Sequence, residues 1–384
     1  MTGQNMKRLG DYIRPVDVRN RDLKVTRLLG VSITKEFMPS IANIVGTDLS
    51  AYKVVTKGQF AYGPVTSRNG DKISVALLDG YDDAIISQAY TVFEVVDKNA
   101  LDPEYLMMWF RRPEFDRYAR FHSHGSAREV FDWEEMCEVQ VPVPAIEKQR
   151  EIVAEYNTLA TRIETNKKLI ATLEQTAQTL YRHTFVDNID PNNLPQGWRM
   201  GTVADLVTTQ YGYTEIATEE KVGPKFLRIT DIVGSQIDWN SVPHCPITES
   251  EYKKYQLKEG DIVVSRTGAN IGYAKQIRGE IPEAVYASFL VRLKPIDEIY
   301  NWYLGLSVDS QEYKDFIFAN QQGSAQPQAN ANVMGQYPIA IPDENTLKNF
   351  NSVIYPILRK ISLHQLEINK LNEMKPLLLS KMGV

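Results

Sequence analysis

Two long helical segments with the same spacing of apolar residues constrain the fold of this chain more than any other feature. The first covers residues 146–183 and contains no Gly or Pro. Its seam residues recur at alternating intervals of four and three, the heptad pattern of a coiled coil. They are Leu159, Ile163, Asn166, Ile170, Leu173, Ala177 and Leu180. A helix of about 40 residues is roughly 60 Å long, about twice the diameter of a small domain.

The same seam recurs near the C-terminus, displaced by 198 residues. Its members are Ile357, Ile361, His364, Ile368, Leu371, Lys375 and Leu378. The polar interruption recurs too, as Asn166 in the first copy and His364 in the second. At the same offset, the Ser-Arg-Asn-Gly at 67–70 matches the Ser-Arg-Thr-Gly at 265–268. The sequence therefore indicates an internal duplication, in which each copy is a globular part followed by a long helix.

This pattern predicts globular domains at 1–145 and 187–343 and long helices at 146–186 and 344–384. Each seam requires an apolar partner, and an antiparallel pairing with the other helix lets the chain return. The predicted fold class is α+β: two globular α/β domains separated by two long helices that form an antiparallel coiled coil. Asn166 and His364 would then help to set the register of the pair.

Local patterns predict the elements of each globular part. Runs of β-branched and aromatic residues predict strands, and the main ones lie at 25–33, 54–62, 73–78, 90–96, 203–207, 226–232, 261–265 and 289–293. Pro103, near the first turn, begins a predicted helix through Tyr118, and 300–319 occupies the same place in the second copy. Pro356 and Pro376 predict interruptions of the second long helix, with a kink or a fresh start at Pro356.

Charge and cysteine content exclude some classes of protein. The chain has 43 Lys and Arg against 48 Asp and Glu, for a net charge of −5. This argues against indiscriminate nucleic-acid binding by the whole surface, but it permits a local basic cleft. Cys137 and Cys245 alone cannot build a disulfide framework or a zinc site, so we expect a reducing cytoplasm. No apolar run reaches the length of a membrane span, and no membrane partner is expected.

Several segments resemble motifs of one known family. They are VPAIEKQREIV at 143–153, LPQGW at 194–198, GDIVVSRTGANIG at 260–272, GSAQPQANANVMGQYPIAIP at 323–342, FAYGPVTSRNG at 60–70 and ISQAYTVFEV at 86–95. These segments are similar to those of the DNA specificity subunits of type I restriction–modification systems. The first globular part lacks the LPxGW entry, and PDENTLKNF at 342–350 is a degenerate copy of the helix entry.

The resemblance implies a non-catalytic subunit with two target-recognition domains, each of which recognises one half of a bipartite double-stranded DNA sequence. It also implies two methyltransferase subunits docked beside the helices, joined by restriction subunits that translocate DNA. S-adenosylmethionine, ATP and magnesium would be bound by those partners, and no cofactor is expected in this chain.

Catalytic motifs are absent from the sequence. It has no GxxxxGK[ST] phosphate loop, no GxGxxG dinucleotide loop and no amino-methyltransferase tetrapeptide. His122 and His124 form an HxH pair, but no neighbouring carboxylate or Cys completes a metal site, and a hydrogen-bonding loop is favoured. Asp343 with Glu373 and Lys375 imitates a loose nuclease signature, although such charges on a helix are usually a solvated face. We therefore expect no enzyme activity.

Direct recognition of bases requires Arg, Lys, Asn or Gln side chains at base edges, with other polar groups on phosphates. The candidates in the first globular part are Arg68, Asn69, Lys72, His122, His124 and Arg128. Those in the second are Tyr211, Tyr213, Thr214, Arg266, Thr267, Asn270, Gln322, Ser324, Gln326, Gln328 and Asn330. The alternative is that these loops are polar only because they lie on the surface, or that they pack against the helices.

Two other functions remain open from the sequence alone. One is a DNA-independent scaffold whose coiled coil and globular parts bind other proteins. The other is an enzyme with an unrecognised site. Selection of DNA sequences by the chain together with a methyltransferase partner separates the first of these from the DNA-specificity hypothesis.

Overall fold

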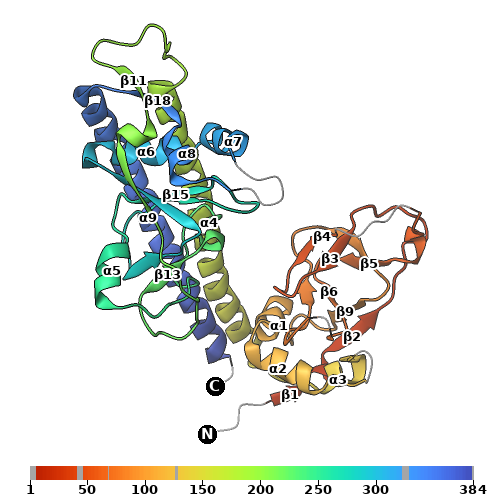
Figure 1. Cartoon of the computed structure of the whole chain (residues 1–384). Coiled ribbons are helices and arrows are strands. Elements are labelled where there is room, and N and C mark those ends of the chain that lie inside the picture. The colour runs from red at the N-terminus through yellow and green to blue at the C-terminus, as the bar shows by residue number, and fades with distance from the viewer. Residues whose placement is uncertain (1–5, 41–45, 68, 126–128, 322–327, 383–384) are drawn as a thin grey trace. The chain divides into compact units, whose positions relative to one another are not determined.

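The computed structural model describes residues 6–40, 46–67, 69–125, 129–321 and 328–382. The chain divides into two compact units. Unit 1 comprises Met1–Arg162 with Lys370–Val384, and unit 2 comprises Ile163–Asn369. The chain has two long helices, α4 (Ile146–Phe185) and α9 (Glu344–Lys381) (Figure 1). Each contributes residues to both units.

Unit 1 contains a four-stranded antiparallel sheet. Its spatial order is β2 (Ile13–Val16), β9 (Thr91–Val95), β6 (Phe60–Tyr62) and β7 (Val75–Leu77). The described residues of unit 1 form three further antiparallel pairs: β1 (Met6–Arg8) with β10 (Gln140–Pro142), β3 (Leu29–Val31) with β4 (Phe37–Pro39), and β5 (Lys53–Thr56) with β8 (Asp83–Ile86).

Unit 2 contains a sheet of the same topology. Its order is β12 (Val207–Tyr211), β17 (Leu290–Pro295), β14 (Ile262–Ser265) and β15 (Ala274–Gln276), again antiparallel throughout. The strands β11 (Arg199–Thr202) and β18 (Pro338–Ile341) pair as β1 and β10 do. The pair β13 (Lys225–Leu227) and β16 (Ala284–Tyr286) is parallel and distinguishes this unit.

The helices repeat with the offset of the seam. In unit 1 they are α1 (Pro103–Phe110), α2 (Pro113–Phe121) and α3 (Trp133–Glu138). Their counterparts in unit 2 are α6 (Asn301–Val308), α7 (Gln311–Ala319) and α8 (Ala331–Gly335), each of which begins 198 residues later. Helix α9 begins at the same distance after α4. Unit 2 adds α5 (Glu249–Tyr255).

Some predicted elements were wrong in their limits. The helix expected from Pro103 to Tyr118 is two helices, because Arg112, which precedes Pro113, is extended with φ −74° and ψ 141°. The strand expected at 54–62 is β5 and β6, separated by a turn at Gly58 with φ +87°. By contrast, α9 continues through Pro356 and Pro376, both of which are exposed.

Aromatic side chains form the centre of each core. In unit 1, Phe60 stacks on Phe93 with ring centroids 4.8 Å apart, and Phe110 meets both edge-on. Tyr156 of α4 and Leu378 of α9 join this core. In unit 2, Phe185 of α4 contacts Tyr303 and Phe350, each at 4.8 Å between centroids. The long helices are therefore anchored directly in the cores.

The two long helices pair in antiparallel fashion within each unit. In unit 2, Phe185 contacts Phe350 and Asn166 contacts His364. The residue number of the partner on α9 therefore decreases as the residue number on α4 increases. In unit 1, the Lys375 ammonium lies 5.1 Å from the ring centroid of Tyr156. The fold class is α+β with two globular parts and an antiparallel pair of long helices, as the sequence predicted.

The predicted seam corresponds to the buried face for most of its length. Fully buried members are Ile163, Asn166, Ile170, Ala177, Ile361, Ile368 and Leu378. Half-buried members are Leu159, Leu173, Leu180, Ile357, His364, Leu371 and Lys375. At two positions the next residue, Tyr181 or Leu358, takes the buried place, because a helix of 3.6 residues per turn drifts from a strict heptad.

Candidate nucleic-acid interface

In unit 2, the end of β14 meets the segment that leads into α8. Thr267 and Gln328 form an antiparallel bridge, and the Ala329 N–H donates to the Arg266 carbonyl at 2.9 Å. Two stretches about 60 residues apart in the chain are thereby joined. The bridge fixes the backbone next to the side chains that were predicted to contact DNA.

Tyr211, the last residue of β12, connects both stretches. Its hydroxyl accepts a hydrogen bond from the Ala331 N–H at 3.1 Å. The Arg266 guanidinium lies over its ring, 5.0 Å from the centroid, a cation–π distance. The Nε atom of Arg266 is buried and has no hydrogen-bond partner among the described residues. We refer to Tyr211, Arg266, Gln328 and Asn330 as the Arg266 cluster.

The remaining members of this region have distinct roles. Gln328 is exposed, and the Asn330 carboxamide oxygen caps α8 by accepting from the Val333 N–H at 2.9 Å. Thr267 is buried, so it shapes the turn rather than presenting a side chain. Asn270 is half-buried, and its carbonyl accepts from the Tyr273 N–H.

Tyr213 and Thr214 do not join the Arg266 cluster. The ring of Tyr213 packs against Phe226 and lies 5.4 Å from that of Tyr255, within a small apolar cluster. Burial and a hydrogen bond to Glu251 raise the pKa of the Tyr213 hydroxyl. Thr214 is exposed beyond the strand. Gly212 allows the backbone after β12 to pass close to Ala287, because a Cβ there would lie 2.2 Å from the Ala287 carbonyl oxygen.

Unit 1 has the same joint at the equivalent place. Val65, which follows β6, bridges to Val130, and Val130 lies 198 residues before Gln328. The Thr66 N–H donates to the Glu129 carbonyl at 2.9 Å. The turn beyond it holds Asn69, whose carboxamide donates to the Val65 carbonyl at 3.3 Å. Lys72 is exposed at the end of this turn.

His122 and His124 share a carboxylate that the sequence analysis missed. Glu135 of α3 lies 3.0 Å from His122 Nδ1 and 3.7 Å from His124 Nε2. The His122 ring also stacks on Tyr118, with centroids 4.2 Å apart. Glu135 is 11 residues away from His124 in the sequence, so only the return of the chain brings them together. No group of three or more His, Cys, Asp and Glu in the described part of the chain is placed to hold a metal.

Two exposed aromatic residues at the ends of corresponding helices were also missed. Phe121, at the end of α2, is 81% exposed, and Phe318, near the end of α7, is 63% exposed. A surface position for a Phe carries no signal in a single sequence. Asp343 has a structural role, since its carboxylate caps α9 by accepting from the Asn345 and Thr346 N–H groups.

Five predicted contact residues lie outside the described residues. They are Arg68, Arg128, Gln322, Ser324 and Gln326. The candidate interface in unit 2 therefore comprises the Arg266 cluster with Thr267 and Asn270. That in unit 1 comprises Asn69, Lys72, His122 and His124. Within the described ranges, no helix is both long and apolar enough to span a bilayer.

Comparison with known proteins places the chain in a family. The family model described as "Type I restriction modification DNA specificity domain" matches residues 52–175 and again 195–375. The chain therefore belongs to the type I restriction–modification DNA specificity family. It is a DNA-recognition subunit and not a catalytic one, as the sequence motifs predicted, and the scaffold hypothesis finds no support.

Individual relatives are distant but agree with the family. The MjaIX specificity subunit of Methanocaldococcus jannaschii is 23% identical over 311 residues, which are 75% of this chain and 70% of that protein. The EcoKI specificity subunit of Escherichia coli is 23% identical over 148 residues, 35% of this chain and 31% of that one. The crystal structure of the S subunit from M. genitalium superposes with a TM-score of 0.60, at 14% identity, covering 100% of this chain and 97% of that one.

Proposed function

We propose that each globular part recognises one half of a bipartite DNA sequence. Residues 1–145 and 187–343 would be the two target-recognition domains, and the helices 146–186 and 344–384 would set the distance between the half-sites. The observation that carries this proposal is the repeated joint. In both units the end of a central strand is bridged to the segment before a short helix, Val65 to Val130 and Thr267 to Gln328.

The chemistry of the joint suits base recognition in unit 2. An arginine whose guanidinium plane is held on an aromatic ring loses less conformational freedom when it binds a guanine edge. Gln328 adds an exposed carboxamide, which pairs best with adenine. In unit 1, Asn69, Lys72 and His124 are the corresponding polar groups, and Lys72 fits a phosphate contact. Arg68, Arg128, Gln322, Ser324 and Gln326 extend these two sets.

The partners follow from the family. We propose that two methyltransferase subunits dock on the long helices and that restriction subunits join them, with S-adenosylmethionine, ATP and magnesium bound by those partners. Cys137 and Cys245 are both free, which fits a reducing compartment and supports a cytoplasmic location. The net charge of −5 suggests weak DNA affinity for the isolated chain and a contribution from the partners.

Selection from a random DNA library tests this proposal. The chain is mixed with its methyltransferase partner, and bound sequences are read before and after the substitution Arg266→Ala. We expect two conserved half-sites, and loss of about 1–3 kcal/mol of base discrimination at positions in one of them only. Lys221→Ala is the matched control, because Lys221 is an exposed cation of unit 2 with no hydrogen bond or ion pair to any described residue. Failure to enrich any sequence would refute the proposal.

A further inference from the structure

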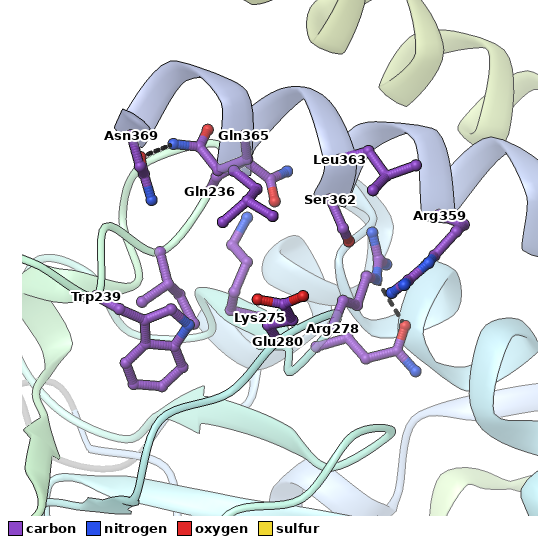
Figure 2. A pocket seen from close by; sticks show the side chains of 13 residues that line it. Gln236, Trp239, Lys275, Arg278, Glu280, Arg359, Ser362, Leu363, Gln365 and Asn369 are labelled. Atoms are coloured by element: carbon purple, nitrogen blue, oxygen red, sulfur yellow. Dashed lines mark hydrogen bonds between the residues drawn. The ribbon is translucent and has the colours of Figure 1, made fainter. Parts of the chain in front are cut away.

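A pocket in unit 2 lies between β15 with its following turn and one face of α9 (Figure 2). The turn packs closely on the helix, because Gly279 has φ +76° and the place of its missing Cβ is 3.1 Å from the Ser362 hydroxyl oxygen. Lys275 and Arg278 extend from the β15 side toward α9, and Arg359 extends from α9 (Figure 2). Three cationic side chains therefore line one pocket.

Among the described residues, no carboxylate lies within ion-pair distance of the Arg278 or Arg359 guanidinium. Arg278 Nε donates to the Gln276 side-chain oxygen at 2.9 Å, and Gln276 in turn donates to the Asn301 carbonyl at 2.6 Å. Arg278 is thus oriented by a neutral amide. Arg359 has no hydrogen bond or ion pair with any described residue. Glu280 also lines the pocket, but it is exposed and pairs with neither arginine.

The acidic groups behind the pocket are already engaged. The Lys275 ammonium donates to the Ser235 carbonyl at 2.9 Å and lies 3.9 Å from the Asp309 carboxylate. That carboxylate is equally far, 3.9 Å, from the Lys314 ammonium, so it is shared by two cations. Glu174 accepts a hydrogen bond from Gln236 at 2.6 Å. Burial lowers the pKa values of Lys275 and Arg278, although the nearby carboxylates of Asp309 and Glu174 act to raise them. Their positive charge is therefore incompletely compensated.

We propose that this pocket binds a small oxyanion, namely a phosphate group, between Arg278 and Arg359. Planar guanidinium groups donate paired hydrogen bonds that match the oxygens of phosphate. The side-chain nitrogen of Asn369, which lines the same pocket, offers a further donor, and its oxygen accepts from Gln365 Nε2 at 2.9 Å. A bound phosphate relieves the repulsion between the cations and links the β15 turn to α9. The free anion and the phosphates of a nucleotide share this chemistry. This site is separate from the Arg266 cluster and does not depend on the proposed DNA recognition.

Calorimetry and thermal unfolding of the full chain test the proposal without DNA. Sodium phosphate, ATP and sodium chloride are titrated at matched ionic strength. We expect saturable heat and a rise in Tm with phosphate but not with chloride. If ATP binds more tightly than phosphate, the nucleotide is the favoured source, and equal or weaker binding favours the free anion. Absence of saturable binding by both would overturn the proposal.

The variants Arg359→Gln and Lys360→Gln make the test specific to the site. Both remove one exposed cation from α9, but only Arg359 lines the pocket. Because Arg359 has no partner among the described residues, its substitution should leave the Tm without phosphate unchanged. Phosphate binding should weaken at least about tenfold in Arg359→Gln, as expected for loss of a charge-assisted pair. Equal binding by the two variants would show that the anion binds elsewhere.

Discussion

At the scale of single residues, the structure separates two tyrosines that the sequence grouped. Tyr211 and Tyr213 are two apart, a spacing that places side chains on the same face of a continuous strand. The strand ends at Tyr211, however, and Gly212 allows the backbone to pass close to Ala287. Tyr213 is consequently half-buried against the small apolar cluster, while Tyr211 stays 42% exposed beside Arg266. The contact of Gly212 with Ala287, 75 residues away, could not be predicted from the sequence.

Tyr211 is expected to position Arg266 rather than contact a base. Tyr211→Leu removes the ring under the guanidinium, and we expect relaxed base preference in the half-site of unit 2, by about 1 kcal/mol or roughly fivefold. Tyr211→Phe keeps the ring and loses only the hydrogen bond to Ala331, so most of the preference should remain. Library selection with both variants measures this. Equal loss in the two variants would mean that the hydroxyl, not the ring, matters.

Glu174 is expected to make unit 2 less stable as pH rises. Burial raises the pKa of its carboxyl, partly opposed by the hydrogen bond from Gln236. The folded state favours the protonated carboxyl, so its contribution to the free energy of unfolding is greatest below the ordinary Glu pKa. As the pH rises from that value to the raised pKa of the folded state, the free energy of unfolding declines. Glu174→Gln should raise the Tm at neutral pH and reduce the dependence of Tm on pH.

Melting curves across the acidic range compare Glu174→Gln with Glu164→Gln. Glu164 is exposed on the same helix, and its replacement should leave the slope as in the unsubstituted chain. A steeper slope in Glu174→Gln would contradict the assignment, since removal of the carboxyl cannot add a titration of its own.

At the scale of elements, the repeated helices could be predicted from the sequence, but only some of the helix breaks could. The offset of 198 residues, derived from the two seams, also relates α1 to α6, α2 to α7 and α4 to α9. The break before Pro113 has a local cause, the preference of the preceding residue for extended backbone, and could have been predicted. The continuity of α9 through Pro356 could not. It depends on Ile354 and Leu358, which are buried on either side of the proline.

The polar pair in the helix seam should cost stability. Asn166 is fully buried, its oxygen faces His364 Nδ1 at 3.1 Å, and its Nδ2 has no partner among the described residues. A buried donor without a partner costs about 1–3 kcal/mol. The double substitution Asn166→Leu with His364→Leu should therefore raise the Tm, while it weakens the definition of the register.

Thermal unfolding checks this expectation against Asn372→Leu, which changes an exposed residue of α9. The control should leave the Tm nearly unchanged. A lower Tm for the double variant would indicate that the Asn166–His364 contact stabilises the helix pair more than two leucines do.

At the scale of the whole molecule, the sequence predicted the order of globular parts and helices, while the compact units divide the helices themselves. Residues 146–162 of α4 belong to unit 1 and residues 163–185 to unit 2, and α9 is divided at Asn369. Contacts such as Tyr156 with Lys375 cause this division, since each core includes the helix ends next to it. A heptad pattern reports which face is buried but not which core it joins.

A matched deletion in both helices tests whether they set the distance between DNA half-sites. Removal of residues 163–169 from α4 and 361–367 from α9 takes one heptad from each, with Asn166 and His364 at the centres. The remaining seams stay in register, and the helices shorten by about 10 Å, or roughly three base pairs. Library selection should therefore return the same half-sites with a gap shorter by that amount. Deletion from α4 alone leaves the seams unmatched and should impair folding, which the Tm measures. An unchanged gap in a folded double deletion would show that something other than these helices determines the spacing.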